Sequence, residues 1–215
     1  MSTISETRND GIPGSGSLLS VLAHDLNNVL GGVTGALSLI EFEKEDSPDL
    51  HNPAYDSYLD ILEKSSLRAS GIVQQLLVLT RQPTDRSEII PLAESLERLA
   101  ASLQAASGTG PAISMEAVPG EARIRGNSIR FEKLILRILL TGHPGRQPDG
   151  GNILLSVYPG NGPSGTPGWR LKILGIECGI GLVRELAAWY GPDLDFLSSS
   201  VGEVDLGFPA DVESI

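Results

Sequence analysis

Apolar residues recur at alternating intervals of three and four along the first part of the chain. The series is Leu19, Leu22, Leu26, Val29 or Leu30, Val33, Leu37 and Ile40. This spacing predicts a long amphipathic helix, capped by Ser15 or Ser17 and ending near Lys44, whose apolar seam packs in a helical bundle. Gly31 and Gly32 interrupt the helix, and we expect close packing to be the reason for them.

A second helix of similar length is expected from Ala54 to Arg81. Asn52-Pro53 supplies a capping residue and a proline at the first helical position, and Pro83 ends the helix. Two antiparallel helices form a single layer, which leaves apolar surface uncovered. A second copy of the chain covers that surface most simply, so we expect a four-helix bundle formed by dimerisation.

After Pro83 the pattern changes to short alternating runs separated by glycine and proline, which indicates a mixed α/β region. Strands are expected at 88–90, 112–118, 122–125, 152–158, 169–174, 194–198 and 203–208, and helices at 92–106, 128–140 and 180–190. The stretch from Pro159 to Gly168 is expected to form a mobile hairpin loop. We therefore expect a flexible leader at 1–16, a helical hairpin at 17–84 and an α/β domain at 85–215.

Composition and charge limit the classes of partner and the cellular location that we expect. The 215 residues carry a net charge of -11, which argues against nucleic acid and against an anionic membrane surface as partners. No apolar run reaches the roughly 18 residues that a spanning helix needs, and the polar N-terminus has no signal-peptide core. The single cysteine, Cys178, is expected to be a small buried residue, and it favours a cytoplasmic location. No Cys/His cluster has the spacing of a metal site.

A polar cluster stands out in the middle of the first helix. At about 100° per residue, His24 points away from the apolar seam, and Asn28 lies on the same face one turn later. Asp25 is adjacent to His24, and Asn27 adds a further amide. A lone exposed histidine is usually unremarkable in function, but Asn and Asp are poor helix formers, and their density here suggests a site.

The run from Leu22 to Leu30, Leu-Ala-His-Asp-Leu-Asn-Asn-Val-Leu, resembles the phosphoacceptor box of two-component histidine kinases. It is similar to the His-Asp-Leu-Asn-Asn version of many hybrid kinases. The resemblance implies that His24 is the phosphorylated residue, that Asp25 is its adjacent acid, and that Asn28 orients the attacking or leaving group. Imidazole suits this role, since it is a neutral nucleophile near pH 7 whose phosphoramidate is labile enough to be passed on.

The order of elements after Pro83 resembles the ATP-binding domain of the same kinases, an α/β sandwich, so the expected fold class is α+β. In that family, asparagines on the helix corresponding to 128–140 hold Mg²⁺ and the nucleotide phosphates. Here Arg137 and Thr141 occupy those positions, and arginine has no lone pair for a cation. The adenine-binding Asp-x-Gly-x-Gly is also absent, and Glu177 has the wrong offset to replace its aspartate. Gly175, Gly179 and Gly181 are expected to form a tight strand-to-helix turn rather than a phosphate cradle.

A retained phosphoacceptor box with a degenerate ATP-binding domain resembles the dimeric histidine phosphotransferases built on a kinase-like scaffold. This resemblance implies a phosphotransferase of a phosphorelay that takes its phosphoryl group from a receiver-domain aspartate and not from ATP. The partners would be response-regulator receiver domains and a hybrid histidine kinase. No cofactor of its own is expected, since the receiver supplies Mg²⁺. Three alternatives stay open: a non-catalytic pseudokinase scaffold, a receiver phosphatase in which Asn28 positions water, and a kinase with a reduced ATP site.

Overall fold

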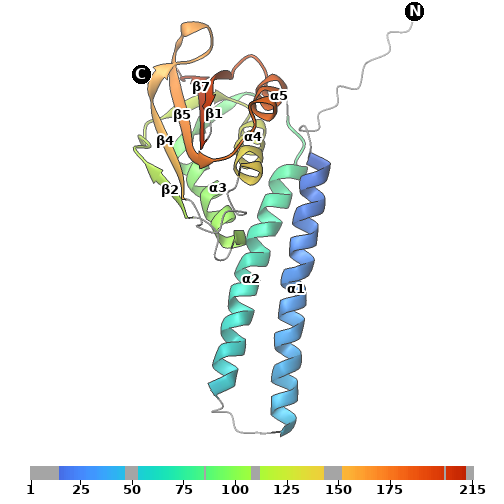
Figure 1. The fold of residues 1–215 in the computed structure, drawn as a ribbon. Coiled ribbons are helices and arrows are strands. Elements are labelled where there is room, and N and C mark those ends of the chain that lie inside the picture. Colours follow the sequence, from blue (N-terminus) through green and yellow to red (C-terminus); the bar gives the residue numbers. More distant parts are fainter. Residues whose placement is uncertain are drawn as a thin grey trace, which may run out of the picture.

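A computed structural model describes residues 15–46, 53–84, 86–107, 112–142, 152–200 and 202–211. A long helical hairpin carries a mixed α/β domain beside one of its ends (Figure 1). Ser15 and Gly16 belong to the first helix, and the rest of the expected leader lies outside the described residues. Most of the turn between the two long helices, which contains His51, also lies outside the described residues, and so does the third histidine of the chain, His143.

The hairpin consists of α1 (Ser15–Asp46) and α2 (Pro53–Thr80), close to the predicted bounds. The buried apolar residues of the two helices are Leu22, Val29, Ala36, Ile72 and Leu79. Part of the predicted seam is exposed in the single chain, as Leu37 on α1 shows with an exposure of 47%. Contact between two helices covers one narrow stripe of each, and the apolar residues outside it remain uncovered in a single chain.

The two helix glycines do not pack as expected. A Cβ atom added at Gly31 would meet no heavy atom within 4 Å, and one at Gly32 would lie 3.8 Å from Oγ of Ser65, an ordinary contact. Helix α1 continues through both positions. Close packing within the chain is therefore not the reason for either glycine.

The remaining elements alternate strands and helices. They are β1 (Glu88–Pro91), α3 (Leu92–Ser107), β2 (Ile113–Glu116), β3 (Arg123–Gly126), α4 (Ser128–Thr141), β4 (Ile153–Asn161), a 3-10 turn η1 (Pro163–Gly165), β5 (Pro167–Ile176), α5 (Ile180–Tyr190), β6 (Asp195–Ser200) and β7 (Gly202–Pro209). The five-stranded sheet has the order β2-β4-β5-β7-β6, and β1 pairs with β3 in a separate two-stranded sheet. Only the β2–β4 pair is parallel within the larger sheet. This is the expected mixed α/β architecture after a helical hairpin.

Half of the predicted mobile loop from Pro159 to Gly168 is strand. Strands β4 and β5 pair as far as Asn161 and Pro167, so only the short η1 turn separates them. Gly168 brings these two strand ends together, since an added Cβ there would lie 2.7 Å from the backbone nitrogen of Gly162. Gly168, which suggested a loop, therefore marks a close strand contact.

Helix α4 is the centre of the α/β core. Every residue from Phe131 to Leu139 is buried, and helices α3, α4 and α5 lie on one side of the larger sheet (Figure 1). Phe131 packs edge-on against Phe208 of β7, with ring centroids 5.6 Å apart. A helix enclosed on all sides also buries its polar positions, which brings Glu132, Lys133 and Arg137 into the interior.

The α/β domain is joined tightly to α2. At Gly71 an added Cβ would lie 2.5 Å from the backbone nitrogen of Ala106 in α3, so the two backbones touch. Nearby, Nε of Arg68 donates to the Ala106 carbonyl at 2.9 Å, and Nε2 of Gln75 donates to the Ser102 carbonyl at 3.3 Å. The hairpin and the domain are thus held in one arrangement along this face of α2.

A buried carboxylate lies at the same contact between α2 and the α/β domain. Glu132 of α4, 6% exposed, pairs with Arg98 of α3 at 2.6 Å and with Arg81, just after α2, at 3.6 Å. Two arginines from two different elements therefore compensate one buried charge. Such pairing is what makes a buried carboxylate tolerable.

Candidate functional site

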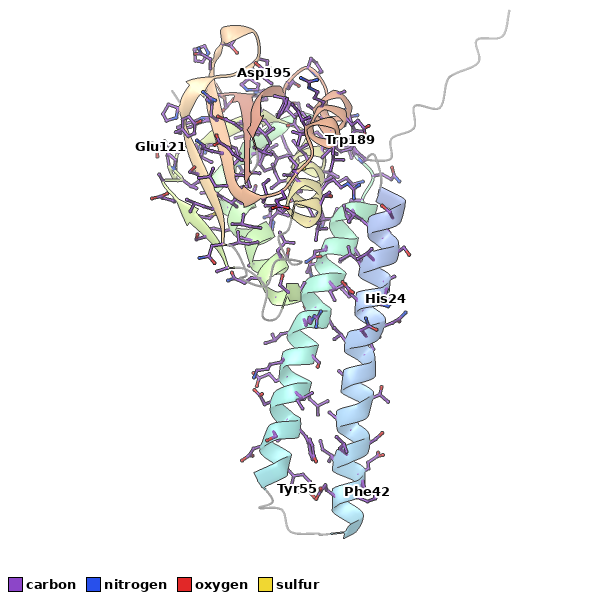
Figure 2. The ribbon with its side chains drawn as sticks, in the orientation of Figure 1. His24, Phe42, Tyr55, Glu121, Trp189 and Asp195 are labelled. Carbon is purple, nitrogen blue, oxygen red and sulfur yellow. The ribbon has the colours of Figure 1, made fainter. Side chains whose placement is uncertain are left out.

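The predicted residues His24, Asp25 and Asn28 come together on α1. Figure 2 shows His24 in the upper half of the hairpin as drawn. The His24 side chain is 74% exposed and the Asp25 side chain 40% exposed. Nδ1 of His24 lies 3.5 Å from the Asp25 carboxylate and 3.2 Å from Nδ2 of Asn28. An accessible imidazole is thus flanked at one ring nitrogen by an acid and by an amide.

The two contacts at Nδ1 favour different tautomers of the ring. An ionised carboxylate only accepts hydrogen bonds, so the Asp25 contact requires a proton on Nδ1. The Asn28 amide nitrogen is a donor and requires a lone pair there, whereas its oxygen, after a half-turn of the amide, accepts from Nδ1–H. With the proton on Nδ1, the ring donates toward one of these two acceptors, and Nε2 carries the lone pair. In this form the imidazole presents a nucleophile to solvent.

The helix face that bears His24 is open beyond Asn28. Gly31 and Gly35 follow on the same face at helical spacing, and a Cβ atom at either position would meet nothing within 4 Å. On the side of the imidazole that faces Gly31 and Gly35, the described part of α1 therefore has no bulky side chain at these two positions. The ring is thus accessible on that side in the single chain.

The second region singled out by the sequence lies at the end of α4. Lys133 and Arg137 sit one turn apart, 3% and 7% exposed, and burial lowers the pKa of both groups. Nε of Arg137 has no hydrogen-bond partner among the described residues. Its neighbour is Cys178, which is half-buried rather than fully buried as expected, and whose thiol pKa is raised by burial.

The turn between β5 and α5 closes directly onto α4. The backbone N–H of Glu177 donates to the carbonyl of Gly142 at 2.9 Å, and a Cβ at Gly142 would lie 2.9 Å from Cβ of Ile176. Gly175 has φ +79°, and an added Cβ would lie 2.1 Å from the Asn152 carbonyl oxygen. Gly175 lies within β5, where the pairing with β7 shifts register between Leu174 and Ile176, so it serves a bulge in the strand and not the predicted strand-to-helix turn.

Sequence reasoning missed two features. One is the contact of α2 with α3, whose sequence signal is Gly71 and Gln75 facing the small residues Ser102 and Ala106. The other is a polar pocket beside the start of α4, which is lined by residues that are distant in the sequence.

Among the residues that the structure describes, no group of three or more His, Cys, Asp or Glu side chains is placed to hold a metal ion. No helix in the described ranges is long and apolar enough to cross a membrane.

Comparison with known proteins shows which protein family and which relatives this chain is similar to. Residues 15–84 match the His Kinase A (phospho-acceptor) domain. A curated relative, the sensor kinase CckA of Brucella abortus (strain 2308), is 23% identical over 197 residues, which is 92% of this chain. The chain spans only 18% of that relative's length.

Solved structures with a similar course of the chain are also histidine kinases. The cytoplasmic segment of histidine kinase QseC matches with a TM-score of 0.41 and 17% identity, over 70% of this chain and 93% of that one. Histidine kinase AdeS of Acinetobacter baumannii matches with a TM-score of 0.39 and 13% identity, over 86% and 97%. The match over residues 15–84 thus gives the hairpin the scaffold of a phosphoacceptor domain like that of histidine kinases.

Proposed function

We propose that the protein is a histidine phosphotransferase of a phosphorelay, with His24 as the residue that carries the phosphoryl group. The observation that carries this proposal is the exposed imidazole of His24 with Asp25 and Asn28 at its Nδ1 atom. The match of residues 15–84 to a phosphoacceptor domain supports it. The donor would be an aspartyl phosphate of one receiver domain, and the acceptor an aspartate of another.

The proposed step follows from the tautomer. The Nε2 lone pair of His24 attacks phosphorus in line, the P–O bond to the receiver aspartate breaks, and that carboxylate leaves with the electron pair. The proton on Nδ1 stays in place, so the phosphorylated ring is cationic. The Asp25 carboxylate stabilises this cation, and Asn28 is placed to hold the ring or a phosphoryl oxygen. Transfer to the second receiver reverses the same step, and each receiver brings its own Mg²⁺.

Transfer without ATP is part of the proposal. Its support is the chemistry at α4, where buried Arg137 occupies a position at which the kinase pattern has a metal-binding asparagine. The contact of Glu177 with Gly142 also places the β5–α5 turn against the end of this helix. A cation in place of a Mg²⁺ ligand opposes metal binding. The α/β domain would then be a docking surface for receivers.

The proposal includes a homodimer and a cytoplasmic location. The homodimer is supported by the apolar surface that the hairpin leaves exposed, including Leu30, Leu37 and Leu67 at 47–58% exposure. Pairing two hairpins into a four-helix bundle buries such residues. A hybrid histidine kinase carrying a receiver domain is the proposed upstream partner.

An ATP-dependent histidine kinase is the second candidate, because the curated relative is named a sensor kinase. One experiment separates the two. The protein is incubated with receiver domains phosphorylated by a radiolabelled small phosphodonor, and in parallel with radiolabelled ATP and Mg²⁺. The control variants are His24→Gln and His51→Gln.

Acid-labile label that comes from a receiver, is lost in His24→Gln and survives in His51→Gln supports the phosphotransferase. Label on His24 from ATP alone would overturn transfer without ATP and support the kinase. Receiver binding without any label in the intact protein would overturn both and indicate a scaffold. Faster loss of phosphate from the receiver, without label on this chain, would indicate a phosphatase.

A further inference from the structure

A polar pocket of about 280 Å³ lies where the segment after α2 meets the start of α4 and the end of α5. Its lining includes Arg86 from the connecting segment, Gly126, Asn127 and Arg130 around the start of α4, and Tyr190 and Asp193 after it in the chain. None of the residues proposed for phosphotransfer lines it. The volume suits a small ion with a few waters, at about 30 Å³ per water.

The pocket is positive at one side. Arg86 and Arg130 both line the pocket, which lies at the N-terminal end of the 14-residue helix α4, where the helix dipole is positive. Asn127 caps this helix by accepting from the Arg130 backbone N–H at 2.9 Å. Its side-chain amide donates to the carbonyl oxygens of Thr84 and Arg86, which fixes the connecting segment against α4.

Arg130 is held in a defined position. Its Nη1 donates to the Tyr190 carbonyl at 3.2 Å, and its guanidinium lies over the ring of Trp189, 5.9 Å from the centroid. These contacts leave other N–H groups of the guanidinium for a ligand, because arginine has five donors in a planar fork. A fixed guanidinium at a helix start is suited to an oxyanion.

Tyr190 supplies an unsatisfied donor at the same place. The residue is 6% exposed, and its hydroxyl group has no hydrogen-bond partner among the described residues. The hydroxyl is packed against Gly126, where an added Cβ would lie 3.0 Å from it. Burial, and then the charge of Asp193, raise the pKa of Tyr190, so the group stays a protonated donor at neutral pH. A buried donor without an acceptor favours the binding of one.

Asp193 determines which anion fits. An ionised carboxylate accepts hydrogen bonds and donates none, so it repels an anion that has no proton to offer. Sulfate is fully deprotonated at neutral pH, whereas inorganic phosphate retains a proton on one oxygen. That oxygen can donate to Asp193 while the others accept from Arg86, Arg130 and Tyr190. We propose that this pocket is a binding site for free hydrogen phosphate.

The test is isothermal titration of the full chain at neutral pH and constant ionic strength. Sodium phosphate, sodium sulfate and O-phosphoserine are titrated into the intact protein and into Arg86→Gln, Tyr190→Phe and Asp193→Asn. Arg184→Gln is the charge-matched control, because Arg184 is exposed on α5 and does not line the pocket. Thermal unfolding confirms that each variant is folded. No receiver is present, so the result is independent of the proposed phosphotransfer.

We expect one phosphate per chain and at least tenfold weaker sulfate binding. Arg86→Gln and Tyr190→Phe should each weaken phosphate binding about tenfold, whereas Arg184→Gln should change it less than twofold. Asp193→Asn should bind sulfate about as tightly as phosphate. Absence of saturable phosphate binding, equal binding of sulfate by the intact protein, or an equal loss in Arg184→Gln would overturn the proposal. Tighter binding of O-phosphoserine would overturn it in favour of a monoester site.

Discussion

The amide nitrogen of Asn28 lies 3.2 Å from Nδ1 of His24, one helical turn away on the same helix. Both residues, and Asp25 between them, belong to α1, so the geometry of the imidazole is set by helix periodicity alone. It needs no contribution from the α/β domain. The chemistry of the site is therefore local, and its partners can be tested one side chain at a time.

Replacing Asp25 with Asn should slow phosphoryl transfer by about 10²-fold or more. The amide keeps the size of the side chain but no longer stabilises positive charge on the ring. Stability should change by less than about 0.5 kcal/mol, because Asp25 is 40% exposed. Initial rates of label transfer from a phosphorylated receiver, with urea unfolding in parallel, check both statements. Glu63→Gln on the exposed side of α2 is the control, and an unchanged rate in Asp25→Asn would remove Asp25 from the proposed mechanism.

Replacing Leu37 with Glu should weaken dimerisation. Leu37 is 47% exposed in the single chain, and a charge at that position cannot be buried in a four-helix bundle without a large cost. Sedimentation equilibrium should show a dimer for the intact protein and a shift toward monomer for Leu37→Glu. Ile89→Glu is the matched control, since Ile89 is 44% exposed but lies on β1, outside the hairpin. Equal dissociation in both variants would contradict a hairpin interface.

Replacing Gly71 with Ala should destabilise the protein by about 1–2 kcal/mol. The new methyl group would lie 2.5 Å from the Ala106 nitrogen and 2.7 Å from the Ser102 carbonyl oxygen, so α2 and α3 must separate. The cost of that strain exceeds the gain of about 1 kcal/mol in helix propensity. Gly31→Ala, in open space, should instead stabilise by up to about 1 kcal/mol. Urea unfolding of both variants measures the difference, and the same sign for both would contradict the backbone contact.

Replacing Lys133 with Met should stabilise the protein by about 1 kcal/mol at pH 7. Lys133 is 3% exposed, burial lowers its pKa, and no ion pair of its ammonium is found among the described residues. Below its folded-state pKa the charge is buried at a cost. As pH rises from that value toward 10.5, the unfolded chain binds more protons than the folded chain, so the intact protein gains stability.

The advantage of Lys133→Met should therefore shrink as the pH is raised. Urea unfolding at pH 7 and at about pH 9.5 measures the change, with Lys64→Met as control because Lys64 is exposed and paired with Asp60. A destabilised Lys133→Met, together with an unaffected Lys64→Met, would mean that the ammonium has a favourable partner in the protein.

Periodicity predicted most of the fold because each long helix carries its own signal. The start of α2 at Pro53 and the whole of α5 from Ile180 to Tyr190 were expected at the observed residues. Periodicity did not predict which apolar residues the single chain buries, and Leu37 shows why. A hairpin that pairs with another copy carries apolar residues for two interfaces, and spacing cannot assign them.

Composition gave a wrong prediction for a glycine-rich segment, because glycine occurs both in loops and where strands approach closely. The glycines between Pro159 and Gly168 suggested a loop, but Gly168 serves a close approach of strands. For the candidate site, helix geometry was enough to bring Asn28 to His24. The pocket at Arg86 and Tyr190 could not be predicted, because its residues come from separate elements that only the folded chain assembles.

The close contact at Gly71 has a consequence for how the chain unfolds. Buried residues of the hairpin, such as Leu22 and Ile72, belong to the same contiguous core as Phe131 and Phe208. Loss of α2 removes the partner of α1 and one wall of the α/β domain together, so the two parts form one cooperative unit. We therefore expect the surface around His24 to lose its structure together with the α/β domain, so that protease resistance of the hairpin would report on the integrity of the distant sheet.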